Sequence, residues 1–216
     1  MLKRIVSQHQ EDHFDNPENA KKFAEHAEKS AKMRFQGFMQ YLTNLNKDGN
    51  YLEIGSGSGI LATMIAEQFS DIRITALDSS THMNAIAREY VKDKGFADRI
   101  TIQAGNVEEK VLMQGLGKFD VIYSTYSMHH WAEPGSVIQN LCTLLKEDGV
   151  LIIYDLKRVW WLYWIPKQSG FLNSVRASFT PREVKEIMRD IGIFSFEFKT
   201  IFPRFLQILA IRKKDV

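Results

Sequence analysis

The chain has 216 residues, of which 44% are hydrophobic and 25% charged, and its formal net charge is +2 at pH 7. These values suit one folded domain with a sizeable core and exclude a disordered chain. The charge is too small for a typical nucleic-acid-binding protein, although Arg212–Lys214 is locally basic. The single cysteine, Cys142, excludes an internal disulfide framework. Without a long apolar run or the apolar core of a secretory signal, we expect a cytoplasmic protein with no stable membrane insertion.

Residues 1–48 are predicted to form a helical cap or lid, and residues 49–216 the main domain. Asn16–Glu18 is a typical helix start, with proline in the first turn. A helical apolar stripe follows, made of Phe23, Ala27, Ala31, Phe35, Phe38 and Leu42. The histidines at 9, 13 and 26 lack the close spacing of metal ligands, so no metal site is expected.

The segment Tyr51–Gly59 predicts a buried strand that breaks into a glycine-rich turn at the start of a helix over 60–69. Glycines allow positive φ and let the backbone approach a ligand closely. A dinucleotide fingerprint would place its third glycine where this chain has Ile60. Glu53 would repel a pyrophosphate and favours a ligand that carries positive charge.

Strands and helices alternate after this turn. Ile72–Asp78 predicts a second strand, and its final carboxylate has the separation from the glycine turn that suits ribose hydroxyls. Thr180–Glu183 is a helix start with a capping residue and proline. Further strands are predicted over 100–104, 119–124 and 150–155, helices over 81–95 and 134–146, and a hairpin over 194–201 and 205–211. The fold class is α/β: a three-layer, doubly wound, mostly parallel seven-stranded sheet with a terminal antiparallel hairpin and an N-terminal helical appendage.

Three motifs resemble those of class I (Rossmann-like) S-adenosylmethionine-dependent methyltransferases. The first is the acidic residue followed by Gly-x-Gly-x-Gly, seen in Glu53–Gly59. The second is Asp-x-Ser-x-x-Met, seen in Asp78–Met83. The third is Phe-Asp-x-Ile followed by a His-His segment, seen in Phe119–Ile122 and Ser127–Trp131. The resemblance covers about residues 45–212 and is closest to the small-molecule, quinone-biosynthesis-like subgroup.

The resemblance implies S-adenosylmethionine as cofactor and S-adenosylhomocysteine as product. It places Asp78 at the ribose, Ser79 and Met83 beside the adenine, and Ser124 over the carboxyamino end and the transferred methyl. Ser79 also suits a plain helix cap and Met83 plain core. The methionine moiety would be surrounded by Glu53, Gly55, Ser56, Gly57 and Gly59, and the adenine pocket completed by Asn106 and Val107. Relatives commonly have Asp at position 106, and an amide oxygen can accept the same hydrogen bond.

Methyl transfer needs a base only if the acceptor atom carries a proton. His129 and His130, just beyond the predicted fourth strand, are candidates for a base or a substrate contact, and Tyr126 is a further candidate. The two histidines could instead cap the loop and pack beside Trp131. Ser124–Ser127 lacks the Asn/Asp-Pro-Pro-aromatic element of similar nucleic-acid and glutamine methyltransferases, so neither substrate is expected.

Lys157–Pro166 holds three of the four tryptophans and is predicted to form a pocket wall, with a homodimer contact or a membrane-surface contact as alternatives. Arg176 could meet an anionic substrate or a surface carboxylate. The predicted activity is transfer of a methyl group to an O, C or N atom of a small, partly apolar molecule. A non-catalytic module that binds S-adenosylmethionine or S-adenosylhomocysteine and an NAD(P)-dependent oxidoreductase are the alternatives.

Overall fold

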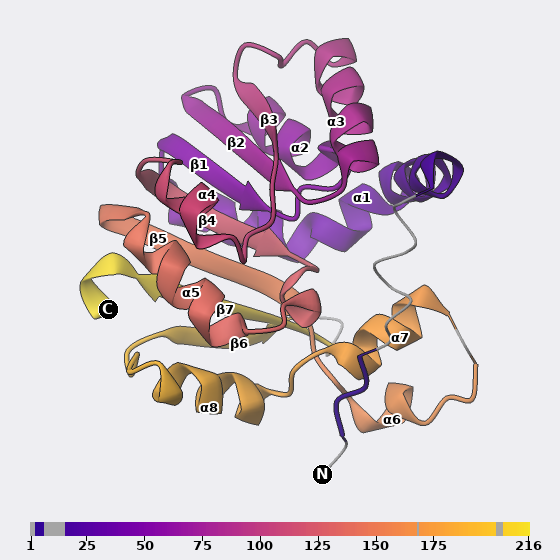
Figure 1. The fold of residues 1–216 in the computed structure, drawn as a ribbon, viewed down its shortest axis with the longest axis vertical. Helices are drawn as coiled ribbons and strands as arrows, with labels where there is room; N and C mark the ends of the chain where they lie inside the picture. Colours follow the sequence, from indigo (N-terminus) through magenta and orange to yellow (C-terminus); the bar gives the residue numbers. More distant parts are fainter. Residues whose placement is uncertain (1–2, 7–15, 168, 202–204) are drawn as a thin grey trace.

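The computed structural model describes residues 3–6, 16–167, 169–201 and 205–216, so His9 and His13 lie outside the described residues. Within this part of the chain, seven strands form one sheet in the order β3-β2-β1-β4-β5-β7-β6 (Figure 1). The strands are β1 (Gly49–Ile54), β2 (Ile72–Asp78), β3 (Ile100–Ala104), β4 (Phe119–Thr125), β5 (Leu145–Leu156), β6 (Glu197–Ile201) and β7 (Leu206–Arg212). The first five run parallel, and β7 pairs antiparallel with both β5 and β6. The predicted fold class is confirmed.

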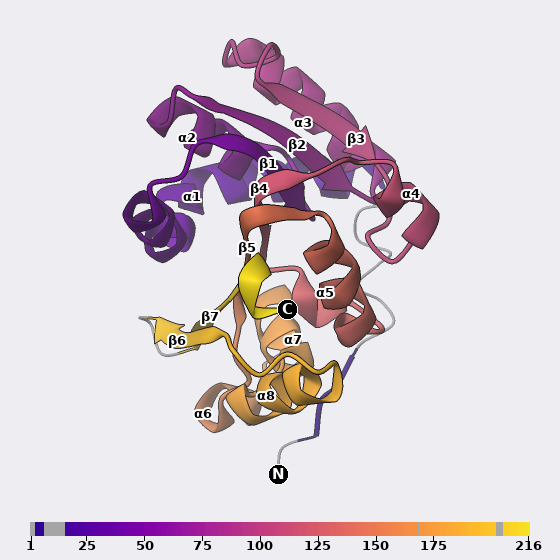
Figure 2. The same cartoon turned by 90° about the vertical axis from the view of Figure 1, so that its left-hand side faces the viewer.

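Helices cover both faces of the sheet. Figure 2 shows α1 and α2 on one side of the strands and α5 on the other. Each face has its own buried apolar cluster, one shared by α1, α2 and α7 and the other by α5 and α8. The helices are α1 (Pro17–Leu45), α2 (Ile60–Gln68), α3 (Thr81–Asp93), α4 (Lys110–Gln114), α5 (Pro134–Thr143), α6 (Trp160–Tyr163), α7 (Gly170–Ala177) and α8 (Pro181–Asp190), with single 3-10 turns at Met128–His130 and Lys213–Asp215.

The predicted helix over 134–146 ends earlier, at Thr143. Leu145 already pairs with Phe119, and the register between β4 and β5 shifts before Val121 meets Val150. The amide N–H of Phe119 also donates to the Leu144 carbonyl at 2.9 Å. Pairing with β4 therefore draws the residues from Leu145 onward into the sheet, although their local pattern suits a helix.

Helix α1 begins where the sequence predicts. The side chain of its N-cap residue, Asn16, accepts hydrogen bonds from the amides of Glu18 at 2.8 Å and Asn19 at 3.4 Å. The predicted stripe is buried except at Phe23, whose side chain is 41% exposed. Phe38 packs against Tyr123 and Tyr154 of the central strands. The helix therefore shares the core of the sheet, and a lid unit ending at residue 48 stays a prediction.

The described residues of the N-terminus lie beside α7. The amide of Ile5 donates to the Arg176 carbonyl at 3.1 Å, and the Arg4 guanidinium donates to the carbonyls of Ala177 and His129. Through the bond to the His129 carbonyl, Arg4 helps to hold the loop that follows β4 in place. Among the described helices, none combines the length and apolar character needed to cross a bilayer.

Candidate active site at the carboxyl ends of the strands

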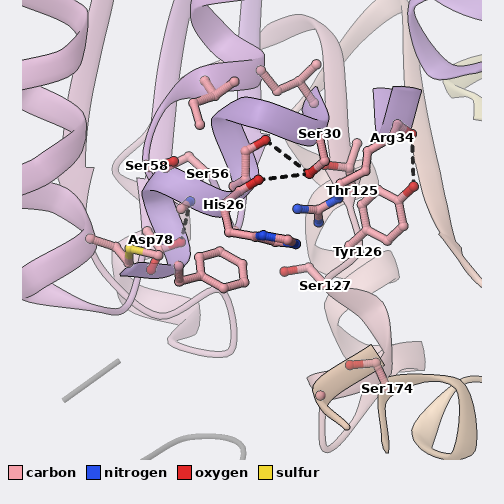
Figure 3. A pocket seen from close by; sticks show the side chains of 18 of the residues that line it. His26, Ser30, Arg34, Ser56, Ser58, Asp78, Thr125, Tyr126, Ser127 and Ser174 are labelled. Carbon is pink, nitrogen blue, oxygen red and sulfur yellow. Dashed lines mark hydrogen bonds between the residues drawn. The ribbon is translucent and has the colours of Figure 1, made fainter. Parts of the chain in front are cut away.

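A cavity of about 660 Å³ lies where β1, β2, β4 and β5 end (Figure 3). Strand β1 has β2 on one side and β4 on the other, so the chain reverses its winding direction at this point. Ligands of doubly wound sheets bind in such a crevice. Segments that contribute to the wall are α1, the turn after β1, the end of β2, the loop after β4, and α7.

The glycine turn is pinned to the end of β2. The amides of Gly55 and Ser56 both donate to the Leu77 carbonyl, at 2.8 and 3.1 Å. Gly55 has φ of +72°, and a Cβ at this position would collide with the Ser127 hydroxyl. Gly57 belongs to the cavity wall, and no atom lies within 4 Å of its Cβ position. A ligand can therefore approach the backbone closely, as the glycine pattern predicts.

Two carboxylates from neighbouring strands face this turn. Asp78 accepts the Gly57 amide at 2.7 Å and the Ser80 amide at 2.9 Å, one on each oxygen. Glu53 is 1% exposed, and among the described residues its Oε2 atom has no hydrogen-bond partner. Burial raises the pKa of Glu53 to about 8, the nearby Tyr123 hydroxyl lowers it in part, and Asp78 raises it further. A cationic ligand group would give this buried carboxyl the partner that it lacks, and would favour its charged form.

The structure brings Glu53, Gly55, Ser56, Gly57, Asp78 and Met83 into the cavity wall but leaves five other predicted cofactor contacts outside it. Gly59 instead allows α2 to pack on α3, since a Cβ there would lie 3.2 Å from Ala87. The Ser124 hydroxyl donates to the Ile54 carbonyl across the sheet at 3.1 Å. The remaining three are Ser79, which is exposed, Val107, which is buried in the core, and Asn106, which accepts the Glu108 amide at 3.0 Å. For all five residues outside the cavity wall, the predicted contact with the cofactor stays a prediction.

Helix α1 supplies a polar stripe that the sequence patterns did not single out. His26, Ser30 and Arg34 are spaced four residues apart, so they share one helix face. Figure 3 shows His26 and Arg34 reaching toward the middle of the cavity, opposite Tyr126 and Ser127. The Arg34 guanidinium carbon lies 4.9 Å from the centre of the Tyr126 ring. The i, i+4 spacing beside the apolar stripe was the signal that could have found them.

His129 forms a pair with Asp155 at the floor of the loop after β4. Its Nδ1 lies 2.8 Å from Asp155 Oδ1, and its amide donates to Oδ2 at 2.9 Å. Both side chains are almost fully buried. His129 lines the cavity, and its Nε2 has no hydrogen-bond partner among the described residues. The carboxylate fixes the proton on Nδ1 and leaves Nε2 as an acceptor, which is the arrangement of a general base.

The other two catalytic candidates have different surroundings. The ring of His130 stacks on His129, with centroids 4.1 Å apart. Desolvation, followed by the His129 ring, lowers the pKa of His130 to about 4. Tyr126 has a positive φ of 53°, and its hydroxyl donates to the Arg34 carbonyl at 2.9 Å. Burial raises the pKa of this hydroxyl well above its ordinary value, so Tyr126 anchors α1 in this structure.

The tryptophan-rich segment does not form the cavity wall that the sequence suggested. Trp160 and Trp164 are each 70% exposed and Trp161 is 45% exposed, and none of the three lines the cavity. The wall comes instead from Leu156 and from Phe171 of α7. Among the described residues Arg176 forms no ion pair with a surface carboxylate, and its contact with an anionic substrate stays a prediction. It donates to the carbonyls of Tyr163, Ile165 and Lys167 and to the side chain of Asn173.

Comparison with known proteins places residues 45–191 within a family model described as a methyltransferase domain. The chain is 32% identical over 110 residues to a ubiquinone biosynthesis O-methyltransferase of Actinobacillus pleuropneumoniae, covering 50% of this chain and 45% of that protein. It is 29% identical over 140 residues to a malonyl-[acyl-carrier protein] O-methyltransferase of Priestia megaterium, covering 64% and 48%. The chain thus spans about half the length of these curated relatives.

Solved structures share the fold at low sequence identity. The plantazolicin methyltransferase BamL, crystallised with a triazolic desmethylPZN analog and SAH, matches with a TM-score of 0.74 and 18% identity over 94% of each chain. A SAM dependent methyltransferase from Aquifex aeolicus matches with a TM-score of 0.72 and 18% identity, covering 91% of this chain and 98% of that one. These matches show that the three proteins share a fold.

Proposed function

We propose that this chain, which belongs to the methyltransferase domain family, transfers the methyl group of S-adenosylmethionine to a hydroxyl oxygen of a small, partly apolar molecule. The observation that carries the choice of a hydroxyl is the buried pair of His129 and Asp155, because His129 belongs to the cavity wall and its Nε2 has no hydrogen-bond partner among the described residues. A base of this kind is needed only when the accepting atom must lose a proton.

The residues at the other end of the cavity fit the cofactor. Glu53 offers a carboxyl oxygen that has no partner among the described residues to an ammonium group, and Gly57 lets a ligand approach the backbone because no atom crowds its Cβ position. Asp78 uses one lone pair of each oxygen for a backbone amide, so each oxygen can still accept a ribose hydroxyl. When bound, S-adenosylmethionine supplies an electrophilic methyl group on a sulfonium.

The chain itself would orient the acceptor and remove its proton. The new bond joins the acceptor oxygen to the methyl carbon while the bond from sulfur to that carbon breaks, and the hydroxyl proton passes to His129 Nε2. Asp155 then faces a charged imidazolium and stabilises it through the 2.8 Å contact to Nδ1. Helix α1 forms one wall of the cavity, and such a wall would help to hold the two reactants in line and to limit the access of water.

The wall around the acceptor suggests what kind of molecule fits. Phe23, Phe35 and Phe171 offer apolar contacts, and His26 and Arg34 offer polar ones. This mixture supports a partly apolar acceptor that carries a polar or anionic group beside its hydroxyl. By their names, both curated relatives are O-methyltransferases, one of ubiquinone biosynthesis and one of malonyl-[acyl-carrier protein], and this supports an oxygen atom as the acceptor.

The test is transfer of labelled methyl from S-adenosylmethionine into a metabolite extract, together with calorimetric binding of S-adenosylhomocysteine and of NAD. We expect S-adenosylhomocysteine to bind and the label to enter a small molecule through an ether or ester oxygen. Binding without transfer would favour a non-catalytic module. Binding of NAD with none of S-adenosylmethionine would replace the proposal with an oxidoreductase.

A further inference from the structure

An aromatic patch covers the surface at α6 and α7, and the cavity chemistry does not use most of it. The patch consists of Trp160 and Trp164 at 70% exposure, Trp161 at 45%, Phe171 at 46% and Ile165 at 36%. The two helices lie together at one end of the molecule, beside the described N-terminal residues (Figure 1). Soluble surfaces seldom gather large apolar side chains of this kind without a function.

The two helices that carry the patch are packed on the core of the domain. Leu162 and Leu172 are buried and anchor the two short helices on the core. The ring of Phe205 joins the two halves of the patch, 6.2 Å from Trp161 and 5.3 Å from Phe171. Arg176 ties α7 to the end of α6 through the carbonyls of Tyr163 and Ile165, at 3.3 and 2.5 Å. The exposed rings therefore lie on helices that are anchored to the core and to each other.

The stretch of sequence that carries the patch has charged residues of one sign. Between Asp155 and Glu183 the sequence contains no acidic residue, whereas it contains Lys157, Arg158, Lys167, Arg176 and Arg182. Of these, Arg158 is buried and pairs with Glu183, while Lys167 is exposed. Lys3 and Arg4 lie next to the same helices, because the Tyr163 hydroxyl donates to the Lys3 carbonyl at 3.0 Å. The rim of the patch is basic.

We propose that this patch docks the protein on the surface of a bilayer that contains anionic phospholipids. Indole rings suit the boundary between headgroups and acyl chains, because their bodies are apolar and their N–H groups can still bond to water or headgroups. Basic side chains at the rim are attracted by anionic headgroups. The helices are far too short to span the bilayer, so the contact is peripheral.

The same charge argues against a second copy of the chain as the occupant. A two-fold symmetric dimer through this face would bring two basic rims together with no acidic residue from residues 156–182 to neutralise them. An anionic surface supplies the missing charge.

The patch also meets the cavity, since Phe171 belongs to both. An apolar acceptor dissolved in the bilayer could enter the cavity past this ring, a statement that rests on the proposed function.

The test measures binding to vesicles without any methyl donor, so its outcome is independent of the methyltransferase assay. The protein is sedimented with vesicles made of equal parts phosphatidylglycerol and phosphatidylcholine, and with vesicles of phosphatidylcholine alone. We expect binding to the anionic vesicles, weakened by salt, with a blue shift of tryptophan emission. The fourth tryptophan, Trp131, is buried at 5% exposure, so the blue shift reports on the patch.

Replacing the two most exposed rings of the patch, Trp160→Ser with Trp164→Ser, should weaken binding roughly tenfold or more. The matched control is Phe194→Ser, a similarly exposed ring at 78% that lies beyond α8, and it should bind like the unaltered chain. Lys167→Glu should weaken binding and reduce its dependence on salt. Because these side chains are exposed, unchanged thermal unfolding can be checked for each variant.

Several results would overturn the proposal. These are no binding of the unaltered chain to anionic vesicles, equal binding to vesicles of phosphatidylcholine alone, or full binding by the double serine variant. Light scattering that shows a dimer which the double serine variant converts to a monomer would assign the patch to a second copy of the chain.

Discussion

The two halves of the cavity are built in different ways. The half assigned to the cofactor comes from short segments around Glu53–Ser58 and Asp78–Met83, at the ends of two neighbouring strands. The half assigned to the acceptor combines α1, the loop after β4, and α7, which are far apart in the sequence. Local segments can be recognised from residue spacing, whereas remote ones meet only through the fold.

The halves also differ in charge. The cofactor half presents the carboxyl groups of Glu53 and Asp78, and the acceptor half presents His26, Arg34 and the pair of His129 with Asp155. A cationic donor and a polar or anionic acceptor would each meet complementary groups. If the division is correct, substitutions in one half should change cofactor affinity, and substitutions in the other should change turnover.

The largest effect is expected at Asp78. Asp78→Ala should weaken binding of S-adenosylhomocysteine by about 3 to 6 kcal/mol, from two charge-assisted hydrogen bonds of about 1.5 to 3 kcal/mol each. Calorimetric titration measures the change. Asp120→Ala is the matched control, because this carboxylate accepts the Asn50 amide at the opposite end of the sheet. Equal affinity in the Asp78 variant and the unaltered chain would mean that the ribose lies elsewhere.

His129→Gln should lower kcat by about 10²- to 10⁴-fold and leave the affinity for S-adenosylhomocysteine unchanged, because the side chain acts on the proton of the acceptor. Steady-state kinetics and calorimetry separate the two effects. His130→Gln, at the neighbouring ring, which lacks a carboxylate partner among the described residues, is the control and should retain most of the activity. The reverse pattern would move the base from His129 to His130.

The raised pKa of Glu53 predicts a dependence of stability on pH. In the unfolded chain this carboxyl ionises near pH 4.5, and in the ligand-free fold near pH 8, because burial opposes its charge. The native state therefore holds the proton more tightly, and the free energy of unfolding should fall as pH rises from about 4.5 to about 8. Each tenfold difference in the ionisation constant corresponds to about 1.4 kcal/mol.

Glu53→Gln should flatten this profile and stabilise the ligand-free protein at neutral pH by about 3 kcal/mol, while weakening S-adenosylhomocysteine binding. Urea unfolding between pH 5 and 8 provides the measurement. Glu67→Gln, at an exposed position of α2, should leave the profile as it is. A profile of the same slope in the Glu53 variant would show that another group causes the dependence.

The smallest effect is expected at Ser124. Its hydroxyl donates to the Ile54 carbonyl inside the sheet, so Ser124→Ala should cost about 1 kcal/mol of unfolding free energy and leave cofactor affinity unchanged. Denaturant unfolding and calorimetry on the same sample check both statements. A clear loss of cofactor affinity would restore the contact that the sequence resemblance implies.

Much of the fold could be predicted because its signals are local. Apolar runs of strand length, glycines in the turn after β1 and capping residues such as Asn16 and Thr180 act on the backbone within a few positions. The Thr180 capping box forms as expected, with Glu183 bonded back to the start of α8. The place of Asp78 could also be predicted from local signals. Asp78 ends β2, and the end of β2 lies beside the glycine turn that follows the neighbouring strand β1.

The sequence by itself predicted the doubly wound sheet, the glycine turn and the place of Asp78 at a strand end, because the signals for the strands, helices and turns lie within a few neighbouring residues. Tertiary structure decided that His129 meets Asp155, that Arg34 reaches the cavity, and that Trp160 and Trp164 face outward. It also turned Ser124 toward the Ile54 carbonyl and away from the cavity wall. The direction of a side chain depends on strand pairing and helix packing, and these bring together residues that no spacing in the chain connects.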